Sequence, residues 1–437
     1  MLPNDFKNRM KTILGDEYDL FIKEYDKSPV RGLRINKNKI GVDEFLKINP
    51  FNLEKIALSD DCYYFLDEDK VGRHPLHHAG FFYMQDPSAM LPAYSYQIKD
   101  GINILDLCAA PGGKTSQLAC INPNGVVISN EIMRDRSKIL FSNIERLGFK
   151  NVIVTNNDSS ELADKLEGFF DLILVDAPCS GEGMFRKDKK AIEDWSLSLV
   201  ELNSKRQKEI LENANKLLKK DGILIYSTCT FSKEENEDNV NYLINEFNYE
   251  LLKPTDECMC LSKPYIIPYA RRSYHHHNKG EGQFFAVLKK NSEAIELYNE
   301  EKIKKSDLKI VNEFLDTYLE KYSFNIRIYN DSYYHVPSNV SLKGLNVVSY
   351  GVNLGSVIKN RFVPHHNLFT AFGHLFKNKV NLDFNSIEIK KYLHGEEITY
   401  DCPNGYGCIL VNNVALGGFK ATNKVLKNHY PKGLRNF

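Results

Sequence analysis

The chain has 437 residues, which is longer than one ordinary domain and fits two or three. Hydrophobic residues make up 42% of it and charged residues 26%, so the composition forces no part of the chain into disorder. The 57 basic residues equal the 57 acidic residues in number. A net charge of zero neither indicates nor excludes a nucleic-acid partner, because a local basic face remains possible.

The first residues, MLPNDFKNRMKTILG, are polar and helix-like, which predicts no secretory signal. No run of about 18 apolar residues occurs, which predicts no membrane span. The nine cysteines are an odd number without a pairing rhythm, which favours reduced thiols in a cytoplasm. We therefore expect a cytoplasmic protein that does not bind a membrane.

Residues 1–78 are expected to form a small α/β lobe that binds RNA. An amphipathic helical pattern opens the lobe, with apolar side chains at Phe6, Met10, Ile13 and Leu14. The run PVRGLRIN then predicts a strand around residues 30–35.

Residues 79–290 alternate between apolar runs and helical stretches. The runs lack polar alternation, which predicts strands that are buried on both faces and covered by helices. This order is typical of a doubly wound parallel sheet, so a Rossmann-like α/β domain is expected. Ser232 and Glu235 predict a capping box that opens the helix after the last strand. The predicted strands are 102–107, 125–130, 151–156, 170–176 and 222–229, and the predicted helices are 115–120, 134–147 and 202–218.

Residues 291–437 are expected to form a separate C-terminal part. Its first residues, 291–306, are charged and polar, which predicts a linker or the start of a solvated helix. Short strand runs and many turn residues follow, which favours one or two compact α+β or barrel-like modules. The last stretch, 420–437, holds five Lys or Arg residues and no acid. Such a tail fits either a solvated surface or a phosphate-binding face.

A glycine-rich turn, DLCAAPGGKT at residues 106–115, follows the first strand of the predicted sheet. The turn is not a P-loop, because Cys108 occupies a position where that motif needs glycine, and it lacks the three glycines of a dinucleotide fingerprint. A plain helix-capping turn remains an alternative. A turn of this kind also lets a ligand approach the backbone closely.

Acidic residues stand at the ends of the next strands. Glu131 follows the second strand, Asn157 and Asp158 follow the third, and Asp176 ends the fourth. The carboxyl ends of parallel strands line one crevice, where open α/β sheets bind ligands. A carboxylate there can accept hydrogen bonds from ribose hydroxyls, so the set favours a nucleoside-type cofactor.

Two cysteines follow neighbouring strand ends. Cys179 lies in VDAPCSGEGMFRKD and Cys229 in YSTCTFSKEENEDNV. Either one alone fits a small buried thiol, since free cysteine is among the most buried residue types. Both lie in polar turns at the predicted ligand edge, which favours a chemical role. Arg186 and Lys187 fit phosphate contacts and a solvated loop equally well.

Three motifs together resemble the Sun/NSUN-type RNA cytosine-C5 methyltransferases, namely DLCAAPGGKTSQLA, DLILVDAPCSGEGMFRK and LIYSTCTFSKEENEDNV. They span the predicted doubly wound domain in the family's order, and QDPSAMLPAY at residues 85–94 is similar to the family's entry into that domain. RFVPHHNLFTAFG and LGGFKATNKVLKNHYPKGLR resemble the C-terminal modules of bacterial RsmF-type small-subunit ribosomal RNA methyltransferases, whose end is PUA-like.

The resemblance implies that S-adenosylmethionine is the methyl donor and carbon 5 of cytosine the acceptor. In this family a thiolate adds to carbon 6 and makes carbon 5 electron-rich enough to attack the methyl group. The match makes Cys229 this nucleophile, Cys179 the residue that helps product release, and Asp176 the acid that faces the cytosine. The presence of both thiols is the RNA-type pattern. The implied cofactor-binding residues are Cys108, Ala109, Ala110, Pro111, Gly112, Gly113, Lys114, Glu131, Asp158 and Asp176.

Two positions depart from the family's pattern. His275 stands where the family tends to have proline, and Gln283 stands where histidine is common. Neither is expected to touch the catalytic motifs. The histidine run at 275–277 predicts no metal site, because adjacent histidines cannot easily share one ion and no second cluster accompanies them.

The expected partner is RNA, with 16S ribosomal RNA or the small ribosomal subunit as the substrate and a monomer as the acting form. The N-terminal lobe and the basic C-terminal module are expected to grip RNA by shape and phosphate. Three alternatives remain open: the same chemistry on transfer RNA or another ribosomal RNA, a small-molecule or protein methyl acceptor, and a non-catalytic ribosome-assembly factor.

Overall fold

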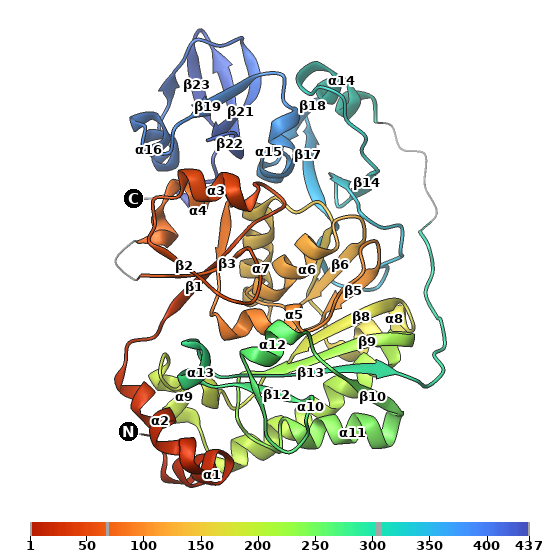
Figure 1. The fold of residues 1–437 in the computed structure, drawn as a ribbon. Coiled ribbons are helices and arrows are strands. Elements are labelled where there is room, and N and C mark those ends of the chain that lie inside the picture. The colour runs from red at the N-terminus through yellow and green to blue at the C-terminus, as the bar shows by residue number, and fades with distance from the viewer. Residues whose placement is uncertain (1, 67–69, 302–307, 436–437) are drawn as a thin grey trace.

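The computed structural model describes residues 2–66, 70–301 and 308–435 (Figure 1). These residues form a small N-terminal sheet, a large central sheet between layers of helices, and two further sheets near the C-terminus. The architecture confirms the predicted α/β class with a Rossmann-like central unit. Within these ranges, no helix is both long enough and apolar enough to pass through a bilayer.

The central sheet carries the five predicted parallel strands. Their order is β7–β6–β5–β8–β9, and an antiparallel strand, β13 (Gln283–Lys290), pairs with β9. The order reverses between β5 and β8, so the crevice at their carboxyl ends is a topological switch point, where such sheets bind ligands. The parallel strands are β5 (Asn103–Asp106), β6 (Val126–Asn130), β7 (Val152–Thr155), β8 (Phe170–Asp176) and β9 (Leu218–Thr228).

Helices bury their apolar stripes on both faces of this sheet. Side chains of α6 and α7 contribute to the core on one face, and those of α8, α10 and α11 contribute to the core on the other. The helix α7 begins and ends where the sequence predicts, because Leu140, Ile144 and Leu147 repeat at helical spacing and Gly148 caps it with a φ of 70°. The helices are α6 (Gly113–Ile121), α7 (Arg134–Leu147), α8 (Ser159–Leu166), α10 (Leu197–Leu217) and α11 (Glu237–Phe247).

The predicted capping box at Ser232 and Glu235 is wrong. The helix α11 begins at Glu237, after Asn236, and Glu235 lies in the turn before it. The Glu235 side chain instead accepts a hydrogen bond from the backbone N–H of Ser180, 55 residues away in the chain. The Glu235 carboxylate therefore makes a tertiary contact with Ser180 and does not cap the start of α11.

The N-terminal segment contacts two different parts of the molecule. Its first helix, α1 (Asn4–Leu14), contains the predicted amphipathic pattern and packs Phe6 against Phe185 and Trp195 of the central unit. The predicted strand is β1, in a sheet ordered β2–β3–β1–β4, and its core continues into the C-terminal sheet beside it (Figure 1). The other elements are α2 (Tyr18–Lys23), β1 (Arg31–Ile35), α3 (Val42–Ile48), β2 (Leu53–Lys55), β3 (Cys62–Phe65), α4 (Pro75–His78), β4 (Phe82–Met84) and α5 (Leu91–Tyr94).

Several short elements complete the central unit, and three of them are strands of its sheet. Residues 302–306 of the predicted linker lie outside the described residues, and Leu297 before them bridges to Glu167. The short elements are α9 (Lys189–Asp194), β10 (Tyr249–Leu252), α12 (Asp256–Cys260), β11 (Lys263–Pro264), β12 (Arg271–Ser273) and α13 (His275–Asn278).

The C-terminal part adds a strand to the central sheet. Strand β16 (Val347–Ser349) pairs antiparallel with β7, so a segment expected to be separate completes the sheet edge. A sheet ordered β14–β15–β17–β18 and a last sheet ordered β19–β21–β22–β23–β20 form the rest. Their elements are α14 (Lys309–Tyr318), β14 (Ile326–Tyr329), β15 (Ser332–His335), β17 (Val352–Ile358), β18 (Arg361–Pro364), α15 (His366–Phe372), β19 (Lys379–Leu382), α16 (Ile387–His394), β20 (Ile398–Thr399), β21 (Gly405–Val411), β22 (Val414–Thr422) and β23 (Val425–Asn428).

Candidate active site

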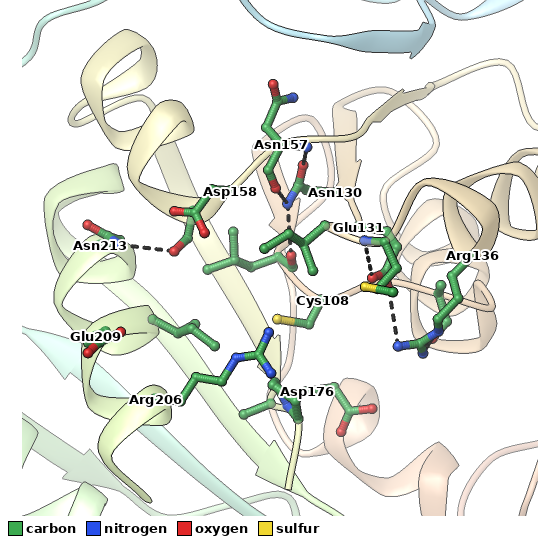
Figure 2. Close-up of a pocket in the computed structure, with 18 of the residues that line it drawn as sticks. Cys108, Asn130, Glu131, Arg136, Asn157, Asp158, Asp176, Arg206, Glu209 and Asn213 are labelled. Carbon is green, nitrogen blue, oxygen red and sulfur yellow. Dashed lines mark hydrogen bonds and ion pairs between the residues drawn. The ribbon is translucent and has the colours of Figure 1, made fainter. Parts of the chain in front are cut away.

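A cavity of about 380 Å³ opens at the carboxyl edge of the parallel strands. The ends of β5, β6, β7 and β8 line it, and side chains of α10 such as Arg206 and Asn213 close one side (Figure 2). The cavity therefore lies at the predicted switch point. It brings Glu131, Asp158 and Asp176 together with both cysteines, Cys179 and Cys229.

The glycine-rich loop contributes to this cavity in part. Cys108 and Ala110 are among its lining residues, whereas Ala109, Pro111, Gly112 and Gly113 are not. Gly112 caps α6 with a φ of 107°, a left-handed conformation that favours glycine. Its N–H donates to the carbonyl of Ala109 (2.8 Å), which closes the turn. The loop thus combines a helix cap with a wall of the cavity.

Glu131 lies at the tip of β6 with its side chain almost fully buried. One carboxylate oxygen accepts a hydrogen bond from the N–H of Met133 (2.9 Å), and the other lies 3.6 Å from a guanidinium nitrogen of Arg136. Arg136 also donates to the carbonyl of Ala110 (2.8 Å) and so ties the β6 tip to the glycine-rich loop.

Asp158 has two contacts that the sequence reasoning did not foresee. Its side chain caps α8 by accepting from the N–H of Ser160 (2.9 Å), and Glu161 accepts in return from the N–H of Asp158 (3.0 Å). This is a capping box, located two strands earlier than the one predicted. Asp158 nevertheless lines the cavity.

Asp176 is fixed by three donors. Lys114 donates to one carboxylate oxygen (2.7 Å), and Ser227 (2.7 Å) and Gln283 (3.2 Å) donate to the other. Lys114 is not a lining residue of the cavity, and its contact with the cavity is through the Asp176 carboxylate. An acid held by one cation and two neutral donors keeps a fixed orientation toward the cavity.

The expectation that Gln283 and His275 avoid the catalytic motifs is wrong. Gln283 donates to Asp176, and the ring of His275 lies 5.9 Å from that of Phe231, which follows Cys229 in its motif. The cause is the antiparallel pairing of β13 with β9, which sets Gln283 beside the end of β9. No local pattern in the sequence indicates this pairing.

The two thiols lie in contact. The Sγ atoms of Cys179 and Cys229 are 2.9 Å apart, and the N–H of Cys229 donates to the Cys179 sulfur (3.3 Å). The hydrogen bond with Cys229 and burial raise the pKa of the Cys179 thiol well above its ordinary value. A protonated Cys179 can donate a hydrogen bond to the sulfur of Cys229 in this contact.

Two buried carboxylates hold the loops that carry these thiols. Glu235 accepts from the N–H (3.0 Å) and hydroxyl (2.5 Å) of Ser180, next to Cys179, and from the side chain of Gln207 (2.8 Å). Glu182 accepts from the N–H of Phe231 (3.0 Å). Burial raises the pKa of Glu235 to about 7. The sequence did not predict either role, because the only signal was an acid three residues after Cys179 and another six residues after Cys229.

Arg186 is not available to bind phosphate. Its side chain is only 2% exposed and pairs with Glu281 (2.9 Å). Its guanidinium also donates to the carbonyls of Lys279 (3.0 Å) and Gly280 (3.2 Å), so it joins the α13 region to the Cys179 loop.

The histidine run has a companion that the sequence could not reveal. One carboxylate oxygen of Glu17 lies 3.1 Å from the Nε2 atoms of both His276 and His277. The ligand atoms of these three side chains lie within 4.8 Å of one another, so an acid from a distant segment joins two of the histidines in a group that could hold a metal ion. The expectation that no second cluster accompanies the run did not include this acid. Lys263 pairs with the other oxygen of Glu17, and hydrogen bonds account for the cluster without an ion.

Four family models match successive stretches of the chain. "16S rRNA methyltransferase RsmB/F" matches residues 93–289, and "N-terminal domain of 16S rRNA methyltransferase RsmF" matches residues 2–87. "RsmF rRNA methyltransferase first C-terminal domain" matches residues 313–372, and "Methyltransferase RsmF PUA domain" matches residues 379–436. Together they reach from one end of the chain to the other, with short gaps.

Curated relatives carry the same name. "Ribosomal RNA small subunit methyltransferase F" of Vibrio vulnificus is 38% identical over 258 residues, which are 56% of this chain and 54% of the relative. The protein of that name from Pectobacterium atrosepticum is 36% identical over 259 residues, or 56% and 53%. The chain thus spans about half the length of the curated relatives it matches.

Solved structures share the central fold. A "Methyltransferase Homolog Protein from Pyrococcus Horikoshii" has a TM-score of 0.56 and 27% identity, covering 65% of this chain and 93% of that one. "NSun6 from Pyrococcus horikoshii with SFG" has a TM-score of 0.60 and 23% identity, covering 67% and 99%. The similarity confirms the Rossmann-like methyltransferase fold. The family models confirm the resemblance to bacterial RsmF-type methyltransferases.

Proposed function

Because the chain belongs to the RsmB/F family of methyltransferases, we propose that it transfers a methyl group from S-adenosylmethionine to carbon 5 of a cytosine in RNA, with 16S ribosomal RNA as the substrate. The observation that carries the proposal is the contact between Cys179 and Cys229, 2.9 Å apart, at a cavity that Asp176 also lines. A structural thiol pair has no need of a fixed carboxylate or of a cavity beside it.

The residues around the cavity suit an adenosyl cofactor. Glu131 at the β6 tip offers carboxylate oxygens that can accept from ribose hydroxyls, and Asn157 and Asp158 lie at the next strand end, where an adenine amine would need acceptors. Cys108 and Ala110 supply the close backbone wall. When bound, the cofactor would supply the methyl group as a cationic sulfonium.

The chain's own groups can carry the remaining steps. The Cys229 sulfur forms a bond to carbon 6 of the cytosine, which moves electron density toward carbon 5. Asp176, held by Lys114, orients the base at its nitrogen 3 and amine side. After methyl transfer the carbon 5 proton leaves, the carbon 6–sulfur bond breaks, and the Cys179 thiol can hydrogen-bond to the departing thiolate.

The test uses labelled S-adenosylmethionine with total RNA and with isolated small subunits, followed by mapping of the labelled base. Cys229→Ala is expected to abolish labelling, and Cys179→Ala is expected to leave a protein–RNA adduct on a denaturing gel. Cys260→Ala changes an exposed cysteine outside the cavity and is the matched control. Full labelling by Cys229→Ala would overturn the mechanism.

The mapped base also decides between the alternatives. Label in transfer RNA or in another ribosomal RNA would keep the chemistry and change the substrate. Label in protein or in small molecules would mean that the methyl acceptor is not RNA. Absence of cofactor binding would leave the assembly-factor alternative. The cytoplasmic location, the monomeric form and the three-part division at residues 1–78, 79–290 and 291–437 remain proposals.

A further inference from the structure

A ladder of asparagines joins the C-terminal part to the cavity. Asn130, at the end of β6, donates to the carbonyl of Asn157 (2.9 Å) and accepts from the N–H of Asn157 (3.0 Å). The side chain of Asn157 in turn donates to the carbonyl of Asn346 (3.1 Å) and accepts from the N–H of Asn346 (2.9 Å). Asn346 directly precedes β16, so the ladder crosses three neighbouring strands.

A second branch reaches the Glu131 loop. The side chain of Asn346 donates to the Oδ1 of Asn156 (3.1 Å). The other end of the Asn156 amide donates to the carbonyls of Glu131 (2.6 Å) and Ile132 (2.9 Å). The Asn156 amide accepts at its oxygen and donates at its nitrogen, which fixes its direction. Asn346 thus contacts the supports of both loops, one carrying Glu131 and the other carrying Asn157 and Asp158.

The ladder lies directly behind the cavity wall. Asn130 and Asn157 are 2% and 4% exposed and line the cavity, where Figure 2 shows them beside Asp158 and Glu131. Asn156 does not line the cavity and Asn346 is exposed on the far side of the ladder. Asn156 and Asn346 can therefore act on a bound cofactor only through the wall that they hold.

We propose that the C-terminal part is built into the cofactor site, with Asn346 and Asn156 as positioning residues that set the affinity for the adenosyl group. Without β16, strand β7 would be the edge of the sheet, and Asn156 and Asn157 would lose the hydrogen bonds that Asn346 makes with them. Because the cavity wall is built from two parts of the chain, the docking of β16 and the binding of the cofactor are coupled. A change at β16 alters binding at the cavity, and binding at the cavity alters the stability of the β16 contact by the same free energy. The identity of the cofactor rests on the proposed function.

The test measures binding of S-adenosylhomocysteine by calorimetry to the full chain. Asn346→Ala removes the side-chain link to Asn156, and Asn156→Ala removes the same link and the two bonds to the Glu131 loop. We expect dissociation constants about three times higher for Asn346→Ala and about ten times higher for Asn156→Ala. The double variant should bind no more weakly than Asn156→Ala, because both changes break one path.

The matched control is Asn339→Ala in the same part of the chain. The Asn339 side chain accepts from Arg327 (2.8 Å) and Asn325 (3.2 Å), away from the cavity, so its removal should leave the affinity unchanged. In turnover, KM for S-adenosylmethionine should rise in Asn156→Ala while kcat at saturation stays the same. A general loss of structure would instead lower kcat and the melting temperature together.

A second readout separates this inference from the proposed function. Without any ligand, amide hydrogen exchange at residues 130–133 and 156–158 should speed up in both variants and not in Asn339→Ala. If exchange is faster in the variants but the wild type does not bind S-adenosylhomocysteine, the cofactor assignment is wrong. The support of the two loops by Asn346 and Asn156 would then still hold. Unchanged exchange and unchanged affinity in Asn156→Ala would overturn the inference.

Discussion

Glu235 gives the sharpest test of how the two thiols are held. Its carboxylate is fully buried and receives three hydrogen bonds, two from Ser180 and one from Gln207. Two donors, the Ser180 N–H and the Gln207 amide, point to the same carboxylate oxygen. The Ser180 hydroxyl has a second partner in Thr230 at 2.9 Å and can turn to it.

Glu235→Ala therefore leaves two buried N–H groups without an acceptor, that of the Ser180 backbone and one of the two on the Gln207 amide, whose nitrogen still donates to the carbonyl of Pro178. Each costs about 1–3 kcal/mol, so unfolding should become easier by about 3–5 kcal/mol once the lost packing is included. The Ser180 backbone would lose its anchor beside Cys179, and the separation of the two thiols would widen. We expect kcat to fall by at least about tenfold, because the nucleophile and its hydrogen-bond partner would no longer be aligned.

Glu235→Gln should keep the geometry. A glutamine oxygen can accept from both donors, while its amide donates to the Ser180 hydroxyl. Burial raises the pKa of Glu235 from 4.5 to about 7, so between these values the folded state holds a proton that the unfolded state has released. Wild-type stability should thus fall relative to Glu235→Gln as the pH rises from about 4.5 to about 7, by up to about 3 kcal/mol.

The assay is urea unfolding of both variants and the wild type at several pH values, combined with methylation at saturating substrates. Taking the difference between Glu235→Gln and wild type removes the contribution of other titrating groups. Equal stability of Glu235→Ala and wild type, or equal damage by Ala and Gln, would refute the reasoning that hydrogen-bond acceptance by this side chain holds the Cys179 loop.

Three further changes probe neighbouring contacts. Gln283→Leu removes a donor to Asp176 and should lower kcat about threefold to tenfold, whereas Gln283→His, which can still donate, should lose less in the same methylation assay. Lys114→Met removes the cation that orients Asp176 and should cost at least about tenfold in kcat with unchanged RNA binding; a normal rate would contradict its role. Gly148→Ala places a Cβ 2.6 Å from the carbonyl oxygen of Thr370, at a φ of 70°. This change should lower the free energy of unfolding by about 1–3 kcal/mol in a thermal or urea melt. The control is Gly433→Ala, whose added Cβ would meet no atom within 4 Å.

Much of the central sheet follows from the sequence because its signals are local. Strands buried on both faces appear as unbroken apolar runs, and β8 spans the predicted residues 170–176. The helix α7 carries its own amphipathic stripe and its own glycine cap, so both ends could be placed. The strand ends then locate Glu131, Asp158 and Asp176 at one edge without any tertiary knowledge.

Partners from distant segments could not be predicted in this way. A three-residue strand such as β16 carries too little pattern to show which edge it joins, and nothing near Asn346 indicates a cofactor site 190 residues away in the chain. The N-terminal helix shows the same limit. Its apolar face is visible in the sequence, but the choice of Phe185 and Trp195 as its contacts is not.

The distance between the thiols illustrates why a candidate site can be only half visible. Parallel strands of known order place Cys179 and Cys229 at neighbouring ends, which requires only the sheet. Bringing their sulfurs to 2.9 Å requires both loops to be tied down, and the structure uses Glu182 and Glu235 for this, at 1% and 0% exposure. Glutamate is almost never fully buried unless it is paired, so the residue type alone predicts that Glu182 and Glu235 are exposed to solvent. Buried carboxylates are tolerated here because each one accepts several hydrogen bonds. One bond of each glutamate, from Ser180 to Glu235 and from Phe231 to Glu182, links the two loops. The position of the candidate nucleophile thus depends on two glutamates that their residue type would predict to be exposed.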